Sequence, residues 1–339
     1  MKPRNLIFGI SALLLATRLL RWLAAKATYS FQHKVVLITG GSRGLGLALA
    51  RRFAREGARI AIVARDHAEL LAAKSDLERC GAEAVFPVVC NLRDHGATEA
   101  MVESVAEHFG ALDIVVNNAG VIVFGPFENH ELSDFELTMD LHAWAPLIVT
   151  RAALPHLPKD GTGRIVNISS IGGRIPQPHL SAYNMSKFAG AGLSDALGIE
   201  LARRGISVTT VAPGLMRTGS HVHAMLRGDH EAEFAWFSNT AALPIFSISA
   251  ERAARQIVEA CRQGRRRLTI TWQARAAVIA NALLPNTTAR ALSIVNRMMP
   301  APVSTPTESR SGAESRSRLT PHWLTWLNDR ASRRYNEVK

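Results

Sequence analysis

Short, unbroken runs of hydrophobic residues alternate along this chain with longer stretches in which hydrophobic and polar positions mix. Such runs are typical of strands buried on both faces, and the longer stretches have the lengths of helices. Strands that alternate with helices predict an α/β fold with one parallel, doubly wound sheet. The predicted strands are Val35–Ile38, Ile60–Ala64, Ala84–Val89, Ile114–Val116, Ile165–Ile168, Val208–Val211 and Leu268–Thr271, with helices over Leu45–Glu56 and His67–Arg79.

An apolar stretch precedes this alternation. Leu6–Thr17 carries no charge and continues past Arg18, but it is shorter than the ~20 residues of a spanning helix unless its arginines reach the membrane surface. A cleaved signal peptide is one alternative, because Ala25-Lys26-Ala27 resembles a cleavage site, and a partly buried helix is another. Two arginines before that site argue against cleavage. We therefore predict that residues 1–33 hold a membrane anchor that spans the bilayer or lies on it.

The C-terminal part of the chain has a different composition. Residues 273–299 predict a helical extension that is both apolar and basic. Residues 300–318 are rich in Pro, Ser and Thr, which predicts a flexible linker, and Leu319–Lys339 predicts a short amphipathic segment. The predicted units are therefore an anchor over 1–33, a catalytic domain over 34–272, the helical extension over 273–299, and the linker with its end segment over 300–339.

The formal net charge of +12 lies in two blocks, not over the whole chain. Residues 1–34 hold six Lys and Arg and no acid, and residues 260–300 hold seven Arg and no acid. Basic residues beside apolar sequence predict contact with an anionic membrane surface, and no motif supports nucleic-acid binding. Three widely spaced cysteines predict neither a disulfide framework nor a metal site.

A glycine-rich loop, Thr39-Gly40-Gly41-Ser42-Arg43-Gly44-Leu45-Gly46, joins the first predicted strand to the first helix. Glycines let a pyrophosphate approach backbone N–H groups, and the helix N-terminus adds unpaired donors. The second strand ends with Arg65, where proteins that bind NAD carry an acid. Arg65 and Arg43 together predict a site for the 2′-phosphate, and so NADP(H) in preference to NAD(H). Asp66, one position further on, keeps NAD(H) as the alternative.

Tyr183-Asn184-Met185-Ser186-Lys187 places a tyrosine and a lysine one turn apart on one helix face. An ammonium close to the phenol, with an oxidised nicotinamide, favours the phenolate and lowers the pKa of tyrosine from about 10. A lone Tyr-x-x-x-Lys is most often a solvated helix face. Here it follows a strand that ends in Ser169-Ser170, and Ser170 is placed to hydrogen-bond a substrate oxygen, which favours a catalytic site.

Five motifs in this order resemble the short-chain dehydrogenase/reductase family over residues 34–271. They are Thr39-Gly40-x-x-x-Gly44-x-Gly46, Asn117-Asn118-Ala119-Gly120, Ser170, Tyr183-x-x-x-Lys187 and Pro213-Gly214. With the apolar ends, the chain resembles the membrane-anchored, hydroxysteroid-dehydrogenase-like members. The resemblance implies a Rossmann-type fold that interconverts a carbonyl and an alcohol, with Tyr183 as general acid/base, Ser170 polarising the substrate oxygen, and Lys187 stabilising the phenolate and binding the ribose. It also implies cofactor contacts at Leu45, Asn91, Leu92, Asn118, Ala119, Gly120, Tyr183, Lys187, Pro213, Gly214 and Thr218.

Two positions depart from the family pattern. Asn91 replaces an Asp, but its amide oxygen can still accept a hydrogen bond from adenine. His142 stands where the family carries a fourth catalytic residue, an Asn whose role is credited to its backbone carbonyl; Pro146 is an alternative source of the helix bend. A cofactor-binding, membrane-associated protein with little or no turnover is therefore the alternative function.

The substrate is expected to be apolar. Val121–Phe127 and residues 219–247 are expected to cover its pocket, with Met225, Leu226, Phe234, Trp236 and Phe237. We expect the catalytic domain on the cytoplasmic side of a membrane, and a homo-oligomer is compatible with the sequence.

Overall fold

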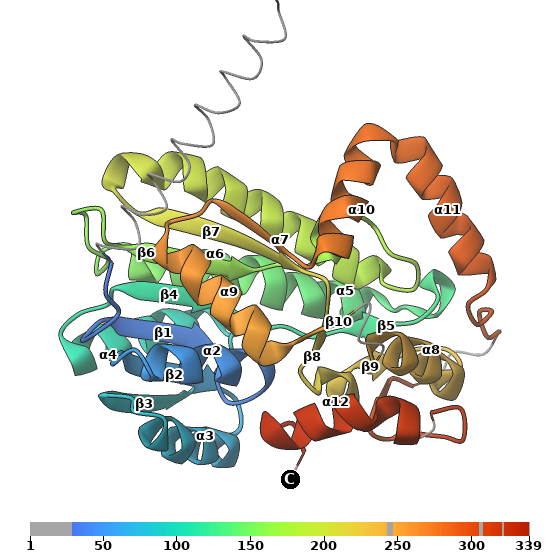
Figure 1. Cartoon of the computed structure of the whole chain (residues 1–339), viewed down its shortest axis with the longest axis horizontal. Helices are drawn as coiled ribbons and strands as arrows, with labels where there is room; N and C mark the ends of the chain where they lie inside the picture. Colours follow the sequence, from blue (N-terminus) through green and yellow to red (C-terminus); the bar gives the residue numbers. More distant parts are fainter. Residues whose placement is uncertain (1–28, 243–246, 305–307, 321, 339) are drawn as a thin grey trace, which may run out of the picture.

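The computed structural model describes residues 29–242, 247–304, 308–320 and 322–338. Within these ranges, a parallel sheet of seven strands crosses the molecule in the order β11-β7-β6-β4-β1-β2-β3 (Figure 1). The sequence predicted all seven to within two residues at each end, and the parallel α/β sheet is confirmed. The strands are β1 (Val35–Thr39), β2 (Arg59–Ala64), β3 (Ala84–Val89), β4 (Ile114–Asn117), β6 (Arg164–Ile168), β7 (Ser207–Pro213) and β11 (Arg267–Ile270).

Helices cover both faces of this sheet. Successive strand residues point to opposite faces, so Val36 and Ile38 of β1 belong to one hydrophobic core while Val35 and Leu37 belong to the other. This arrangement explains why the strands read as continuous apolar runs. The first face carries α2 (Gly44–Ala54), α3 (His67–Arg79) and α9 (Ala250–Arg262); the second carries α4 (His95–Phe109), α6 (Ala145–Ala153) and α7 (Ser181–Glu200), with α5 (Leu132–Met139) packed on α7.

The strand order reverses between β1 and β4, which are neighbours in the sheet although their helices lie on opposite faces. In open α/β sheets the loops that leave such a pair of strands diverge and form a crevice that binds ligands. The glycine-rich loop follows β1, and Asn118–Gly120 follow β4. The fold therefore brings these two predicted cofactor motifs to the same crevice.

The predicted linker is more ordered than its composition suggested. Within it, β12 (Arg310–Ser311) pairs antiparallel with β9 (Met225–Leu226), which in turn pairs with β5 (Val123–Phe124). The end segment forms α12 (His322–Arg334), which packs on α8 (His230–Ala242). Residues 308–320 are thus part of the folded body, a correction to the linker prediction. Pairing through main-chain atoms leaves little trace in composition.

A second short ladder joins β8 (Leu215–Arg217) and β10 (Ser247–Ser249).

The predicted helical extension consists of α10 (Trp272–Leu283) and α11 (Pro285–Arg297), which project from the body as a hairpin (Figure 1). The break falls at Leu284 because the following Pro285 disfavours helical geometry in the residue before it. Proline is favourable at the first position of a helix, so α11 begins there.

The predicted anchor lies almost wholly in residues 1–28, outside the described residues. Tyr29 and Phe31, assigned to it from the sequence, belong instead to the core of the catalytic domain: Phe31 is buried, and the Tyr29 hydroxyl donates to the carbonyl of Thr162 at 2.9 Å. Among the described helices, none has the length and apolar character to cross a bilayer.

Candidate active site

The glycine-rich loop is held in place by the segment that follows β4. The Thr39 hydroxyl accepts from the backbone N–H groups of Asn118 and Ala119 at 3.0 and 3.1 Å. The Asn118 amide donates to the carbonyls of Thr39 and Gly40 at 3.0 and 3.1 Å. Gly40 has a φ of +64°, and a Cβ there would lie 2.9 Å from the Cα of Ala119. Asn118 thus fixes the loop, a contact the resemblance did not specify.

The same loop offers a cradle for an anion. Gly44 is the first residue of α2, so its N–H belongs to the group of helix-start donors with no partner inside the helix. The N-cap residue, Arg43, makes no side-chain cap hydrogen bond. Gly44 has a φ of +56°, and a Cβ there would meet only the carboxylate of Glu337 within 4 Å. The loop residues therefore fit a cofactor pyrophosphate, although the carboxylate of Glu337 lies over Gly44 and the carbonyl of Tyr335 accepts from its N–H.

The two predicted 2′-phosphate ligands have different surroundings in this structure. Arg43 is paired with Glu69, from Nη1 to Oε1 at 2.9 Å, and the Ser42 hydroxyl donates to the other oxygen of Glu69 at 2.9 Å. Arg65 is exposed at the end of β2. Asp66 is the N-cap of α3, accepting from the N–H of Glu69 at 2.9 Å. Asp66 therefore has a structural use, and Glu69 is a site residue that the sequence reasoning missed.

Ser170, Tyr183 and Lys187 are brought together by β6 and α7. Ser170 follows β6, and its hydroxyl accepts from the N–H of Gly172 at 3.1 Å, starting a short 3₁₀ turn, η3 (Ile171–Gly173). The Lys187 ammonium lies 5.6 Å from the centre of the Tyr183 ring and donates to the carbonyl of Ile168 at 3.1 Å. The predicted catalytic residues thus share one site at the carboxyl edge of the sheet.

The protonation of this site differs from the expectation. Burial raises the pKa of Tyr183, while its hydrogen bond with Ser170 acts in the opposite direction. Burial also lowers the pKa of Lys187 to about 7. The expected depression of the Tyr183 pKa is therefore absent from the protein without cofactor. The reason is that burial of the Tyr183 phenol itself disfavours the charged phenolate.

His142 lies in a π-helical turn, η2 (Asp140–Trp144), between α5 and α6. Its Nδ1 is 2.8 Å from the hydroxyl of Ser186, which donates its proton to the Tyr183 carbonyl at 2.8 Å. Nδ1 must therefore carry the proton of that contact, and Nε2 accepts from the N–H of Val121 at 3.2 Å. Burial, with Lys187 nearby, lowers the pKa of His142 well below 6.5. The imidazole is thus neutral, and both its nitrogens are engaged.

The imidazole also shapes its surroundings. A Cβ on Gly120 would lie 2.6 Å from the Nε2 of His142, so only glycine fits beside this ring. A cavity of about 10 Å³ lies among His142, Lys187 and Pro146, close to the smallest volume that holds a water. Pro146 is the second residue of α6, which follows the π-turn directly.

A cavity of about 120 Å³ opens onto Ser170 and Tyr183. It extends to Pro213-Gly214 at the end of β7 and to Thr218, whose hydroxyl donates to Ser220 at 2.9 Å. Ile122 and Phe237 line it and pack on a hydrophobic cluster in which Leu226 and Phe234 are buried. Trp236 lines a larger cavity of about 930 Å³. The predicted pocket cover is therefore correct only in part.

His221, within the predicted stretch 219–247, lines the catalytic cavity. Asn328 also lines it and was not predicted, since no local pattern links α12 to this site. The other expected cofactor residues lie apart from it: Asn91 is exposed and accepts from the N–H of Arg93 at 3.3 Å, and Leu92 is buried.

The fold and the site define a nicotinamide-dependent oxidoreductase of the Rossmann type. The family model for short chain dehydrogenase matches residues 34–225. The chain is 35% identical over 251 residues to the protein SadH of Mycobacterium tuberculosis, covering 73% of this chain and 89% of that one. The chain belongs to the short-chain dehydrogenase/reductase family, whose members act on CH–OH and C=O groups.

Two solved structures are also similar. One is a short chain dehydrogenase from Burkholderia cenocepacia in complex with NADP, with a TM-score of 0.62, 30% identity, and coverage of 73% of this chain and 100% of that chain. The other is L-sorbose reductase from Gluconobacter frateurii complexed with NADPH and L-sorbose, with a TM-score of 0.62, 28% identity, and coverage of 71% and 96%.

Proposed function

We propose that this protein is an NADP(H)-dependent oxidoreductase that reduces the carbonyl group of an apolar substrate, or oxidises the corresponding alcohol. The observation that carries the proposal is the cavity in which Ser170 and Tyr183 face Pro213-Gly214, with Lys187 directly behind Tyr183. A hydroxyl donor, a phenol and an amine thus lie beside the segment expected to hold the nicotinamide.

The preference for NADP(H) is supported by charge. Arg43 is the N-cap of α2 and Arg65 directly follows β2, so both belong to the end of the crevice where the adenine ribose is expected. Their guanidinium groups suit a phosphate in geometry and charge. The solved relatives with bound NADP and NADPH support the same preference. Release of Arg43 from Glu69 would free it for the 2′-phosphate.

The chemistry follows from the states of the side chains. Bound NADPH would supply a hydride to the carbonyl carbon. Ser170 donates a hydrogen bond to the substrate oxygen, and Tyr183 gives that oxygen the proton that completes the alcohol. Because burial raises the pKa of Tyr183, the phenol holds its proton at neutral pH and is available as the proton donor for reduction. Lys187 then helps to return a proton to the phenolate.

His142 need not abolish this activity. The imidazole is neutral and tied to Ser186 and Val121, so it positions the turn before α6 and does not compete with Tyr183 for protons. The alternative function, cofactor binding with little or no turnover, rests on this one substitution.

The test is consumption of NADPH, and separately of NADH, with a panel of apolar ketones and aldehydes. We expect turnover with NADPH, and none with Tyr183→Phe, whose Kd for NADPH should equal that of the unmodified protein. Tight NADPH binding without turnover on any carbonyl would support the alternative function. Full activity in Tyr183→Phe would refute the assigned proton donor.

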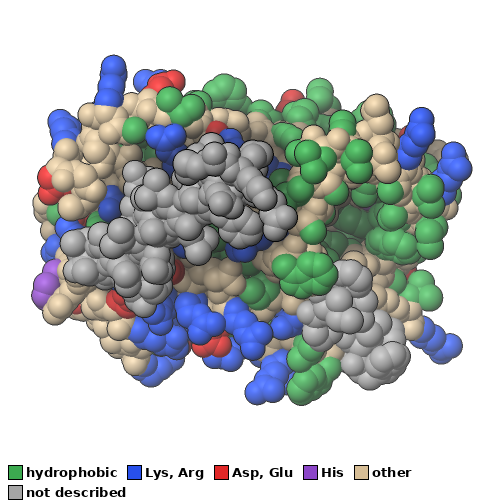
Figure 2. Space-filling view, turned by 45° about the horizontal axis from the view of Figure 1, so that its top comes forward, with side chains coloured by type: hydrophobic (Ala, Val, Ile, Leu, Met, Phe, Trp, Pro, Cys, Tyr) green, Lys and Arg blue, Asp and Glu red, His purple; other side chains and the backbone are tan. Residues whose placement is uncertain are grey.

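We also propose that α10 and α11 rest on an anionic membrane surface, with the catalytic domain on the cytoplasmic side. Trp272 and Leu283 are 72% and 74% exposed, and Ile294 and Met298 are also exposed. Figure 2 shows hydrophobic side chains gathered on the side of the molecule that carries these helices, with basic side chains at its edge. No acidic residue occurs between residues 260 and 307, so this surface matches an anionic bilayer.

Sedimentation with vesicles tests this contact. The protein should bind vesicles that contain phosphatidylserine, and Leu283→Asp with Ile294→Asp should lower the bound fraction strongly. Replacing Glu107 and Glu128, exposed acids on other elements, with Gln serves as the control. Loss of a dimer without any change in vesicle binding would show that the surface joins two copies instead.

A further inference from the structure

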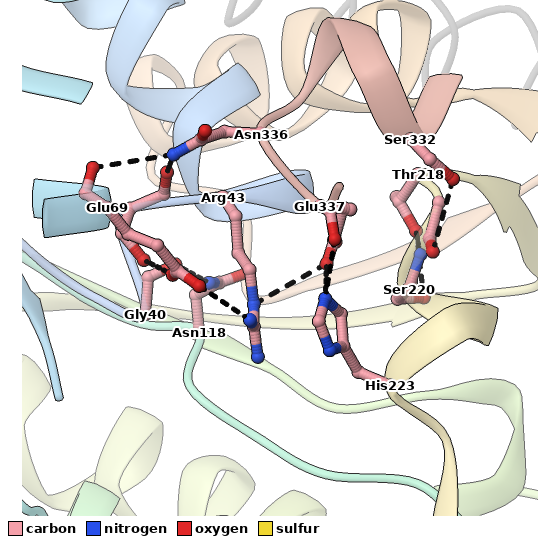
Figure 3. Close-up of polar contacts among 12 residues, drawn as sticks. Gly40, Arg43, Glu69, Asn118, Thr218, Ser220, His223, Ser332, Asn336 and Glu337 are labelled. Carbon is pink, nitrogen blue, oxygen red and sulfur yellow. Dashed lines mark hydrogen bonds and ion pairs between the residues drawn. The ribbon is translucent and has the colours of Figure 1, made fainter. Parts of the chain in front are cut away.

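The C-terminal helix ends directly over the glycine-rich loop. After α12 the chain reverses at Asn336, which has a positive φ of 57°, a conformation that asparagine tolerates better than most residues. The N–H of Glu337 donates to the carbonyl of Ser332 at 2.9 Å, the hydrogen bond of a Schellman C-cap. This turn aims Glu337 back toward the start of α2 (Figure 3).

Three consecutive residues, Tyr335–Glu337, contact the loop and form what we term the C-terminal tail. The carbonyl of Tyr335 accepts from the N–H of Gly44 at 2.9 Å. The Asn336 amide donates to the carbonyl of Ser42 at 3.2 Å and to that of Glu69 at 3.4 Å. The tail therefore occupies the N–H of Gly44, a donor at the start of α2 that could otherwise bind a phosphate.

The side chain of Glu337 adds a negative charge at this position. It is only 6% exposed, and one carboxylate oxygen lies 2.5 Å from where a Cβ of Gly44 would stand. The other oxygen lies 3.4 Å from Nε of Arg43 and 3.2 Å from Nε2 of His223 (Figure 3). It makes no hydrogen bond within the described residues. A carboxylate thus stands in the anion cradle, close to one of the two arginines assigned to the cofactor.

We propose that the C-terminal tail is autoinhibitory: it competes with the phosphates of the dinucleotide for the glycine-rich loop. The proposal rests on the proposed use of NADP(H). Two anions at one helix N-terminus repel each other, and the space over Gly44 holds only one of them. The cofactor therefore binds the fraction of molecules in which the tail has left the loop, and its apparent affinity is reduced accordingly.

The docked tail is a defined state with a local release point. Tyr335 is buried in the core beside α2, with the guanidinium of Arg51 5.4 Å from the centre of its ring. Arg334 forms an ion pair with Glu251 at 3.2 Å. Beyond Tyr335, the contacts include the two amide hydrogen bonds of Asn336 and the charge contacts of Glu337. The backbone of Glu337 is also held, by its N–H on the carbonyl of Ser332 and by its carbonyl, 2.8 Å from Nε2 of His223. Release of the tail breaks these contacts together with the hydrogen bond from the N–H of Gly44 to the carbonyl of Tyr335, and so loosens the end of α12.

The first test measures the Kd of NADPH by titration. Glu337→Gln keeps the shape of the side chain but removes its charge, and we expect about tenfold tighter NADPH binding than in the unmodified protein. The matched control is Glu107→Gln, an exposed acid on α4, which should leave the Kd unchanged. An unchanged or weaker Kd in Glu337→Gln would overturn the proposal. Absence of NADPH binding in every variant would instead refute the proposed cofactor.

A second test uses the unmodified protein and so does not depend on how a variant folds. Arg333 and Arg334 at the end of α12 are exposed and offer trypsin sites beside the tail. Saturating NADPH should increase the initial rate of cleavage there severalfold, because release of the tail frays the helix end. Slower cleavage would mean that the tail closes over bound cofactor, which contradicts competition.

Discussion

The buried imidazole of His142 should make the stability of the protein depend on pH in a way that one substitution removes. In the folded protein its pKa lies well below the ordinary value of 6.5, because burial and Lys187 disfavour the charged form. The unfolded chain therefore binds a proton that the folded protein does not. Stability from this group is fully present above about pH 6.5 and is lost as the pH falls toward the folded pKa.

The magnitude follows from the same linkage. Because one proton binds only to the unfolded chain, the unfolding free energy falls by about 1.4 kcal/mol for each pH unit below 6.5. Between pH 6.5 and pH 5, His142 should thus contribute a loss of about 2 kcal/mol. His130 and His221 also have lowered pKa values, His221 to about 4, so the unmodified protein should lose more in total.

The assay compares urea unfolding of the unmodified protein and His142→Asn at pH 7.5 and at pH 5. The unfolding free energy lost between pH 7.5 and pH 5 should be about 2 kcal/mol smaller in His142→Asn than in the unmodified protein. The other groups titrate in both proteins, so their contributions cancel in this comparison. At pH 7.5 the variant should be less stable by about 1–3 kcal/mol, because the shorter amide cannot reach both Ser186 and Val121. Equal pH dependence in the two proteins would refute a neutral, buried imidazole.

Three further substitutions probe the site. Arg65→Asp should raise the Kd of NADP(H) by roughly tenfold to a hundredfold, the loss of a charge-assisted contact, and lower that of NADH; calorimetric titration of both cofactors checks this, and equal affinities in the unmodified protein would contradict it. Lys187→Met should weaken NADPH binding as well as turnover. An unchanged Kd for NADPH would contradict the predicted contact of Lys187 with the ribose. Gly120→Ala should lower the unfolding free energy by about 1–3 kcal/mol by crowding His142. That loss should be smaller in the His142→Asn background, so strictly additive losses would show that the two side chains do not meet.

The strands could be predicted because a parallel sheet covered on both faces imposes a local pattern. Each of the seven strands needs apolar side chains on both faces, which marks it in the sequence without reference to its neighbours. The C-terminal region gave no such signal. β12 consists of Arg310 and Ser311, and its place is set by main-chain pairing with Met225 and Leu226, far away in the sequence.

The candidate site shows the same division. Residues carried by short motifs, such as Gly44, Tyr183 and Lys187, were found because the spacing of the chemistry is local. Glu69 and Glu337 were missed because they reach the loop from a neighbouring helix and from the end of the chain. Burial of Tyr183 raises its pKa in the protein alone, an effect that the spacing of Tyr183 and Lys187 in the sequence does not show.

One helix connects the two halves of the crevice. Asn328 and Ser332 lie four residues apart and so share a face of α12. Asn328 lines the catalytic cavity, and Ser332 packs so closely on Gly219 that no Cβ fits there. Glu337, just beyond the same helix, stands in the phosphate cradle at the other end. A displacement of the tail that reached α12 would therefore move a wall of the substrate cavity. The docked tail disfavours cofactor binding and at the same time holds α12, a wall of the substrate cavity, in place. Movement of the tail would therefore change both the cofactor site and the substrate site.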